Sequence, residues 1–323
     1  MFKLRSTFLC ILFSLTGYCQ IKWKNVDSLF QPLPKSVHVY YTNDSLDGKP
    51  NVAYYVEADL KDKKLEFTSD TTYRRRFTPM QFFQKNDHPL LVVNCTFFEF
   101  VNNSNLNVVI KDKRVISHNA KTFKSSIDTT RRLRLYSSAI GINKRRKADV
   151  AWIKTDSTKR FAKAVQFPFT SGGNLVMKRG SSVTRLTAPE SANYDPFIKW
   201  KMQTAVGGGP ALIQRGELKI TNEEERMFAG KAINDKHPRT TMGYTKDGKL
   251  IILVIQGRTP GIAEGATLIQ EANMLKDIGC WEALNLDGGG SSCLLVNGKE
   301  TIKPSDPNGQ RPVPAVFLIK NKR

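Results

Sequence analysis

Short apolar runs separated by polar turns fill the first quarter of the chain. Residues 37–41 and 52–56 are rich in β-branched and aromatic side chains and are bounded by Asn, Asp, Gly and Pro, which is typical of strands. Thr78 and Pro79 supply a helix N-cap and a proline at the first helical position, so they predict a short helix over residues 80–85. The apolar residues 90–93 predict a buried strand that ends at Asn94.

The second half of the chain shows clearer periodicity. Residues 241–256 predict a hairpin that turns at Asp247-Gly248. The strongest helix signal follows, with Thr267 as N-cap, Gln270 three residues later and Gly279 as terminator. Its apolar positions recur near helical spacing at Leu268, Ala272, Leu275 and Ile278. This helix leads into the strand 283–286, and the chain closes with an apolar strand over residues 313–319.

The region between these parts predicts short strands with charged turns. Residues 138–142 form one such strand and the basic residues 143–147 its turn, whereas the prolines and mixed polarity of residues 188–202 predict helical or irregular structure. The chain has no internal repeat and no low-complexity linker. We therefore predict an α+β fold of mixed, mostly antiparallel sheets with a few helices. It forms a single large domain over residues 71–323, preceded by a strand-rich N-terminal extension over residues 20–70.

The first 19 residues have the pattern of an export signal. Lys3 and Arg5 precede the apolar run 8–13, and Gly17-Tyr18-Cys19 predicts cleavage before Gln20. The run is too short to span a bilayer, and no later segment has the length or apolarity of a transmembrane helix. We expect a periplasmic or secreted protein with no stable membrane span. A lipoprotein anchored through Cys19 is the alternative, although Tyr18 replaces the small residue that such a site prefers.

Three cysteines remain after removal of the signal: Cys95, Cys280 and Cys293. An oxidising compartment permits a Cys280–Cys293 disulfide with Cys95 free. Three buried thiols are the equal alternative.

The formal net charge of +21 raises the question of a polyanionic partner. The densest basic segment, residues 131–147, contains the strand 138–142 and its turn, so a solvated basic hairpin explains it. No zinc-finger pattern, RNA-recognition signature or basic helix accompanies the charge. We expect no nucleic-acid partner, and an exported protein of this charge would meet anionic glycans, phosphorylated polymers or membrane surfaces.

The most informative stretch is Asn285-Leu286-Asp287-Gly288-Gly289-Gly290-Ser291-Ser292. It places an acid at the end of a strand, and its glycines let backbone N–H groups approach an anion without a Cβ in the way. A tight connection between strands is the alternative, but three glycines beside an acid and two serines exceed what a turn requires. The stretch is neither a Walker loop nor a nucleophile elbow.

Other polar groups also gather at predicted strand ends. The second glycine cluster, Gly207-Gly208-Gly209-Pro210, could form the opposite wall of the same pocket. Arg239, followed by Thr240 and Thr241, could hold a phosphate through a bidentate contact, although a surface arginine is the simpler explanation.

The segment 256–265 adds further candidates. Gln256-Gly257-Arg258 ends the hairpin, and Glu264 precedes the helix, where its charge would favour the helix N-terminus. The four histidines lie far apart in sequence and no cysteine pair has zinc-ligand spacing. We therefore expect no cofactor and no histidine metal site, while a carboxylate-bound Mg²⁺ or Ca²⁺ stays open because its ligands need not cluster in sequence.

Five blocks in order resemble the phosphodiester glycosidase family, which includes the lysosomal uncovering enzyme and exported bacterial relatives. They are residues 94–98 with 107–109, residues 205–210, residues 239–243, residues 256–258 through Gly265, and residues 285–291. Residues 311–313 also resemble the closing strand of the family. Two positions depart from its pattern: Cys95 replaces a small Gly or Ala, and Gln256 replaces an Asp found in many members.

This resemblance implies hydrolysis of a sugar-1-phosphate diester, such as an α-N-acetylglucosamine-1-phospho-sugar, at the glycosidic C–O bond. The leaving phosphomonoester is already a stabilised anion, so phosphate-binding donors matter more than a strong general acid. Asp287 is then the catalytic candidate, as nucleophile, base or oxocarbenium stabiliser, and Glu264 is the next carboxylate. The implied substrate-binding residues are Asn94, Gly207, Gly208, Gly209, Arg239, Thr240, Gln256, Arg258, Asn285, Gly288, Gly289, Gly290 and Ser291.

Two other functions compete with this one. The loss of a carboxylate at Gln256 and the positive charge favour a non-catalytic or degenerate relative that binds or helps assemble an anionic exopolysaccharide. A nucleic-acid phosphodiesterase has only the net charge in its support.

Overall fold

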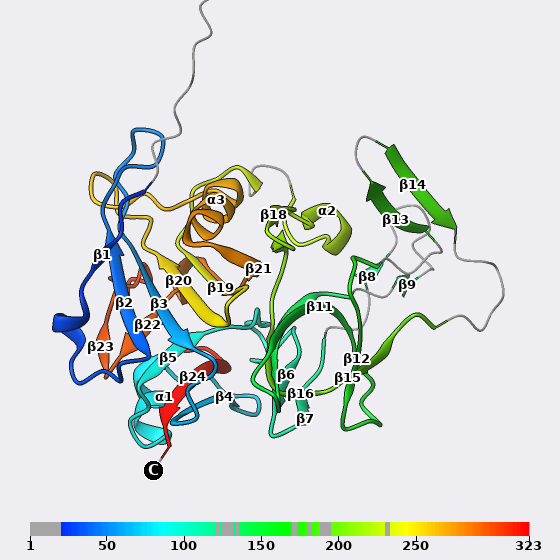
Figure 1. Ribbon diagram of the computed structural model, residues 1–323, viewed down its shortest axis with the longest axis horizontal. Coiled ribbons are helices and arrows are strands. Elements are labelled where there is room, and N and C mark those ends of the chain that lie inside the picture. The colour runs from blue at the N-terminus through cyan, green and yellow to red at the C-terminus, as the bar shows by residue number, and fades with distance from the viewer. Residues whose placement is uncertain are drawn as a thin grey trace, which may run out of the picture.

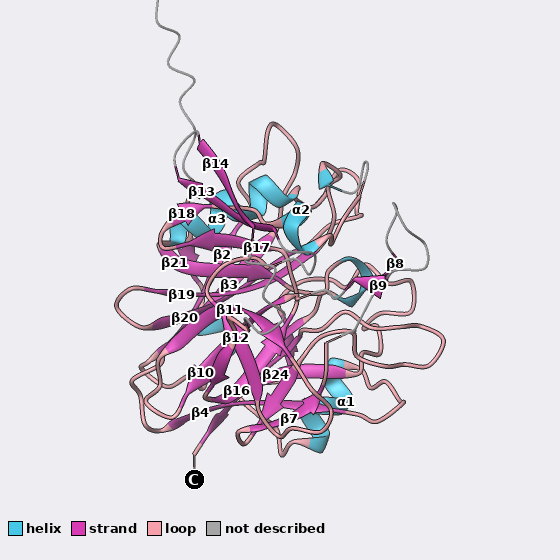
Figure 2. Cartoon of the chain, turned by 90° about the vertical axis from the view of Figure 1, so that its right-hand side faces the viewer, coloured by secondary structure: helices cyan, strands magenta, loops and turns pink. Residues whose placement is uncertain are grey.

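The computed structural model describes residues 21–119, 123–124, 132–133, 136–169, 174–179, 182–187, 195–229 and 233–322. The predicted signal peptide, residues 1–19, lies outside these ranges. Three antiparallel sheets make up the body, and the helices lie near its two ends (Figures 1 and 2).

Each sheet draws strands from distant parts of the chain. In spatial order, the eight-stranded sheet contains β1 (Lys24–Asn25), β2 (Val37–Thr42), β3 (Ala53–Asp59), β20 (Lys249–Ile255), β19 (Arg239–Thr245), β21 (Cys280–Asn285), β17 (Ala211–Gln214) and β18 (Glu217–Leu218). The seven-stranded sheet contains β15 (Ile198–Trp200), β12 (Ala162–Val165), β11 (Ala148–Lys154), β10 (Ser138–Asn143), β16 (Met202–Gly207), β6 (Val109–Lys111) and β7 (Arg114–Ser117). The five-stranded sheet contains β23 (Lys299–Glu300), β22 (Leu294–Val296), β5 (Leu91–Asn94), β24 (Ala315–Asn321) and β4 (Leu65–Thr71).

The remaining elements are small. Two separate hairpins pair β13 (Asn174–Arg179) with β14 (Ser182–Thr187) and β8 (Phe123–Lys124) with β9 (Arg132–Leu133). The α-helices are α1 (Pro79–Lys85), α2 (Asn222–Glu225) and α3 (Leu268–Ile278), and two short 3-10 helices are η1 (Asp27–Phe30) and η3 (Gly289–Ser291).

The central strand β20 is apolar at successive positions because both of its faces are buried. Ile251, Leu253 and Ile255 pack with α3 on one face. Ile252 and Val254 point into the main core, where side chains of all three sheets meet. The helix α1 covers the outer face of the five-stranded sheet through Phe82. Antiparallel sheets packed face to face therefore hold the site described below, and the prediction of mostly antiparallel sheets with few helices is confirmed.

The local signals at element ends are confirmed in detail. Thr78 and Thr267 each form a capping box, in which the threonine hydroxyl accepts from the backbone N–H of Gln81 or Gln270. Gly279 ends α3 with a φ of 94°, a left-handed conformation that glycine adopts without strain. The hairpin β19–β20 and the strands β2, β3, β5, β10, β21 and β24 also form where the sequence predicts them.

The predicted helical or irregular segment 188–202 needs correction in its described part. Residues 198–200 form β15, the edge strand of the seven-stranded sheet, which pairs with β12. Pairing satisfies the backbone and buries Trp200, so tertiary contacts decide the conformation. Residues 188–194 lie outside the described residues.

The cysteine alternatives are also resolved. Cys95, Cys280 and Cys293 are all buried free thiols, so the Cys280–Cys293 disulfide is wrong. Cys280 begins β21 and packs in the cluster beneath α3, whereas Cys293 packs with α1 beside the five-stranded sheet. The two thiols therefore belong to different packing clusters.

The N-terminal strands share hydrogen-bonded sheets with the second half of the chain. β3 pairs with β20, and β4 pairs with β24. In the eight-stranded sheet, β3 pairs with β20 on one side and β17 pairs with β21 on the other, so β19, β20 and β21 are inner strands and the strand end that carries Asp287 is fixed.

Candidate active site

Asp287 follows β21 and is anchored through its backbone on both sides. Its N–H donates to the Cys95 carbonyl at 2.8 Å, and its carbonyl accepts from Asn94 Nδ2 at 2.6 Å. The preceding residue, Leu286, donates its N–H to the Thr240 carbonyl. Ends of β5, β19 and β21 therefore converge on this one residue.

Asn94 is the centre of the network that holds the loop. Its Oδ1 accepts from the Cys293 N–H and lies 3.1 Å from Thr240 Oγ1, which is also 3.1 Å from Ser292 Oγ. The Asn94 side chain is fully buried. Since both ends of its amide bind protein atoms, its observed role is to position Asp287, and its substrate contact stays a prediction.

One oxygen of the Asp287 carboxyl group is free of hydrogen bonds within the described part of the protein. Its Oδ2 atom is buried and has no hydrogen-bond partner among the described residues. Burial raises the pKa of Asp287 to about 7, although the Ser291 hydroxyl, the Arg311 guanidinium and the Gly288 N–H offset part of this effect. A carboxyl group with this pKa exchanges its proton near neutral pH, as general acid–base chemistry requires.

Two guanidinium groups lie against the glycine turn. A Cβ on Gly289 would lie 3.0 Å from Arg258 Nη2, and a Cβ on Gly290 would overlap the guanidinium of Arg311. Gly289 also has a φ of 60°. The glycines are therefore required because the arginines approach the backbone closely, and they place two cations beside Asp287.

Arg311 is held rigidly in this position. Its Nε donates to Asp306 Oδ2 at 2.7 Å, and the hydrogen bond lowers the pKa of Asp306. The Phe100 ring lies 5.7 Å from the Arg311 guanidinium carbon. Arg258 is more exposed and follows β20 with a φ of 59°. An anion at the turn would thus meet one fixed and one more accessible guanidinium.

The second glycine cluster packs directly against the strand that delivers Asp287. A Cβ on Gly208 would lie 2.5 Å from the Asn285 carbonyl oxygen, and Asn285 Nδ2 donates to the Gly209 carbonyl. The N–H groups of Gly207, Gly208 and Gly209 donate to the carbonyls of Val108, Ser138 and Asn285. The structure brings the two glycine clusters together as predicted, but these three donors already bind backbone.

Arg239 is buried, and its Nε and Nη2 atoms both donate to backbone carbonyls. Its Nε donates to the Ala266 carbonyl at 2.9 Å, and Nη2 donates to the Asp235 carbonyl at 3.2 Å. Glu271 of α3 lies 3.9 Å from Arg239 Nε, and burial raises the pKa of Glu271 to about 8 although Arg239 opposes this effect. The observed contacts of Arg239 join β19 to α3 and its preceding loop, and its predicted contact with phosphate stays a prediction.

Glu264 and Gln256 lie on the loops beside Arg258. The Glu264 carboxylate faces Lys49 at 3.8 Å, and no hydrogen bond among the described residues joins it to Asp287. Gln256 is buried, and its Oε1 accepts from the Lys303 N–H at 3.0 Å. Gln256, which departs from the family pattern, therefore links the end of β20 to the loop that leads to Asp306.

Sequence reasoning missed Arg311 and Glu225 as parts of the site. Glu225 is buried beside Gly209, and its carboxylate accepts from the N–H groups of Ser138 and Ala211 and from two hydroxyls. The only sequence feature that pointed to Arg311 was its place in residues 311–313, which resemble the closing strand of the family. Each of these two residues contacts a glycine of the site that lies more than ten positions away in the sequence, so local sequence patterns could not reveal the contacts.

Within the described ranges, no cluster of three or more His, Cys, Asp or Glu has the arrangement of a metal site. No described helix is both long and apolar enough to cross a membrane.

A family model described as Phosphodiester glycosidase matches residues 88–320. The chain belongs to the phosphodiester glycosidase family. A curated relative is mouse N-acetylglucosamine-1-phosphodiester alpha-N-acetylglucosaminidase, 36% identical over 141 residues, which cover 41% of this chain and 26% of that protein. An uncharacterized prophage-derived protein of Bacillus subtilis is 39% identical over 81 residues, 25% of this chain and 12% of that protein. The matched regions thus span about a quarter or less of these relatives.

Solved structures share the fold of this phosphodiester glycosidase family member. The catalytic domain of the zebrafish N-acetylglucosamine-1-phosphodiester alpha-N-acetylglucosaminidase has a TM-score of 0.58 and 18% identity, covering 95% of this chain and 90% of that one. A hypothetical protein from Synechocystis has a TM-score of 0.63 and 16% identity, covering 92% of this chain and 63% of that one.

Proposed function

We propose that this protein is an exported hydrolase that cleaves a sugar-1-phosphate diester to free sugar and a phosphomonoester. The observation that carries the proposal is the uncommitted carboxyl oxygen of Asp287 on a turn flanked by the Arg258 and Arg311 guanidiniums. Membership of the phosphodiester glycosidase family supports the reaction class. Export rests on the predicted signal peptide.

The proposed reaction uses the two kinds of group differently. Arg258 and Arg311 bind the phosphate oxygens and stabilise the negative charge that the departing phosphomonoester gains. Asp287 takes a proton from the water that attacks the anomeric carbon, the C–O bond to phosphate breaks, and its electron pair leaves with the phosphate. Because that leaving group is a weak base, a second carboxylic acid is not needed, which fits the position of Glu264 beside Lys49.

The proposal predicts which bond breaks. The purified protein is incubated with an α-N-acetylglucosamine-1-phospho-sugar in water enriched in oxygen-18, and both products are analysed by mass spectrometry. Cleavage at the glycosidic bond puts the label in the free sugar. Label in the phosphate instead would refute the glycosidase reaction and indicate a phosphodiesterase that cleaves a P–O bond.

Asp287→Asn should abolish release, whereas Glu264→Gln should retain most of it. The non-catalytic alternative is favoured by Gln256, whose carboxamide replaces the usual carboxylate and binds Lys303. Binding of the diester by the wild-type protein without turnover, under conditions in which a related active enzyme releases sugar, would establish that alternative.

A further inference from the structure

A strongly basic pocket opens at the start of β16, at the opposite end of that strand from Gly207. It has a volume of about 410 Å³, and its basic side chains are Lys113, Lys144, Arg160, Lys199 and Lys201. No acidic side chain is among the described residues that line it. We call it the basic pocket. Its cations come from the turns after β6 and β10, from the loop before β12, and from β15 and the residue after it, so the fold gathers them from four places in the sequence.

The charges of the basic pocket are not neutralised within the protein. None of its five basic side chains forms an ion pair with another described residue. The nearby acid Asp195 is bound by Lys154 and Lys163. Like charges that gather without counter-charges raise the local concentration of anions and attract them over about a Debye length.

The pocket also has an aromatic floor, in which Trp200 is buried and fixed and Phe161 is partly exposed. Trp200 Nε1 donates to Asp149 Oδ2 at 2.6 Å, and the indole lies over Gly141, where a Cβ would come within 2.6 Å of Cη2. The Phe161 ring lies beside it, with Lys199 Nζ 4.3 Å from the ring centroid. Aromatic faces carry partial negative charge and bind the C–H faces of sugar rings as well as cations. Phosphate alone would need only the lysines, so this floor points to a ligand with sugar rings.

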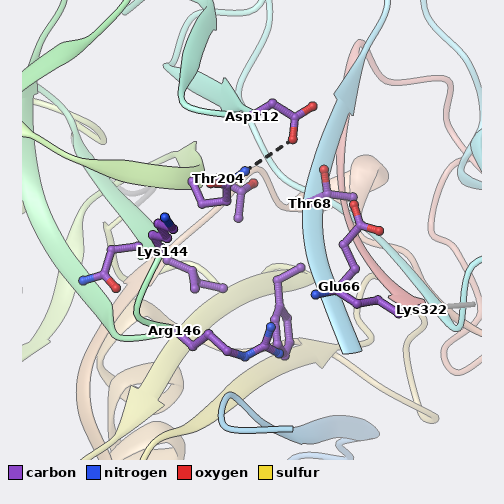
Figure 3. Close-up of a pocket in the computed structure, with 11 residues that line it drawn as sticks. Glu66, Thr68, Asp112, Lys144, Arg146, Thr204 and Lys322 are labelled. Carbon is purple, nitrogen blue, oxygen red and sulfur yellow. Dashed lines mark hydrogen bonds between the residues drawn. The ribbon is translucent and has the colours of Figure 1, made fainter. Parts of the chain in front are cut away.

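The adjoining pocket differs in its charges, as Figure 3 shows. It shares Lys144 with the basic pocket but also contains Glu66 and Asp112. Its Arg146 donates to the carbonyls of Leu60, Asp62 and Leu65 and therefore holds the main chain together. Anion attraction is therefore stronger in the basic pocket, which has no carboxylate in its described lining, than in this adjoining pocket.

One strand connects the basic pocket to the candidate active site. β16 begins at Met202 in the pocket and ends at Gly207, and the next residue packs against Asn285, two residues before Asp287. Six extended residues span roughly 17–20 Å. At this separation a single diester could occupy only one of the two places, and a ligand that occupied both would be a chain of several sugar units.

We infer that the basic pocket is an accessory subsite that binds the non-reacting part of an anionic, phosphate-bearing glycan. The inference rests on the proposed function for the reacting end of that glycan. Lysines bind its phosphates, and the partly exposed Phe161 ring, which lies beside the buried Trp200, packs against its sugar rings. The natural substrate is then a polymer and not a small diester.

The test compares two double charge reversals in the full protein. Lys199→Glu/Lys201→Glu changes the pocket, and Lys22→Glu/Lys24→Glu makes the same charge change on exposed residues near the edge strand β1. Fluorescence anisotropy measures binding of an end-labelled poly(hexose 1-phosphate), and sugar release measures kcat/KM on a small sugar-1-phosphate diester. Thermal melting checks that both variants fold.

We expect the pocket variant to bind the polymer roughly tenfold more weakly and the control variant to lose less than twofold, because electrostatic attraction acts mainly at short range. Both should keep wild-type kcat/KM on the small diester. Phe161→Ala should weaken binding of poly(hexose 1-phosphate) but not of inorganic polyphosphate. If the wild type hydrolyses nothing yet shows this binding pattern, the proposed function fails and the subsite stands.

Three results would overturn the subsite. Equal losses in the two double variants would show that only net charge matters. Wild-type affinity in the pocket variant would show that the polymer binds elsewhere. If the wild-type protein bound oligothymidylate or polyphosphate as tightly as poly(hexose 1-phosphate), the case for a glycan ligand would be lost.

Discussion

Replacing Asp287 by asparagine should abolish activity and stabilise the fold above neutral pH. Burial raises the pKa of Asp287 in the folded protein to about 7, from an ordinary value of 3.8. The folded state therefore binds this proton more tightly than the unfolded state does. The free energy of unfolding should fall as pH rises from about 4 to about 7, because ionising the buried group then opposes folding. Asparagine does not titrate, so the variant escapes this loss.

The expected stabilisation by Asp287→Asn follows from the size of the pKa shift of Asp287. One pKa unit corresponds to about 1.4 kcal/mol, so a shift of about three units gives at most about 4 kcal/mol. Asp287 is only half-buried and its ionised form is partly screened by solvent, which reduces the expected gain to roughly 2–3 kcal/mol. At roughly 2 °C per kcal/mol for a large domain, Tm should rise by about 4–6 °C.

The assay is thermal melting followed by circular dichroism at pH 5 and pH 8 for both proteins. The difference in Tm between variant and wild type should be larger at pH 8 than at pH 5. Other buried acids, such as Glu271, titrate equally in both proteins and cancel in this difference. A variant that is no more stable at pH 8, or a difference that is independent of pH, would refute the assigned environment of Asp287.

Asp70→Asn provides a control of opposite sign. Burial raises the pKa of Asp70, but hydrogen bonds from Lys85 and Asn86 and the charge of Lys111 outweigh this effect and lower it overall. The ionised form therefore stabilises the fold above the unfolded pKa and loses this contribution as pH falls. Asp70→Asn should therefore lower Tm by the same amount at pH 5 and pH 8, since both lie above the unfolded pKa of 3.8, and the loss should shrink only below about pH 4.

Three further predictions test individual contacts. Gly290→Ala should lower kcat/KM for the diester at least tenfold, measured by sugar release, because a Cβ displaces the Arg311 guanidinium; unchanged kinetics would separate Arg311 from phosphate binding. Arg239→Met should lower the free energy of unfolding by about 3 kcal/mol in urea titrations, since it removes the donors of the Ala266 and Asp235 carbonyls and the cation beside the buried Glu271 carboxyl. The added change Glu271→Leu should restore part of that loss, and no restoration would show that the pair is not coupled. Thr267→Ala should cost about 1 kcal/mol in the same titrations by removing the N-cap of α3, and a neutral effect would contradict the capping role.

The sequence by itself determined the elements whose signals are local. Thr267, Gln270 and Gly279 predicted both ends of α3, because caps act between residues within one turn of each other. The glycine turn after Asp287 was also visible, because its composition exceeds the needs of a connection. The segment 198–200 was not predictable, since its strand forms only by pairing with β12.

Tertiary structure alone decided which polar groups remain open at the site. Arg239 and Arg311 look alike in sequence, yet burial beside α3 commits Arg239 to Ala266 and Glu271. Arg311 instead lies on Gly290, held by Asp306. The amides of the second glycine cluster are likewise committed to partners outside their own segment. Hydrogen-bond partners and burial arise from contacts between residues far apart in the chain, so residue type shows which chemistry is possible and packing decides where it is available.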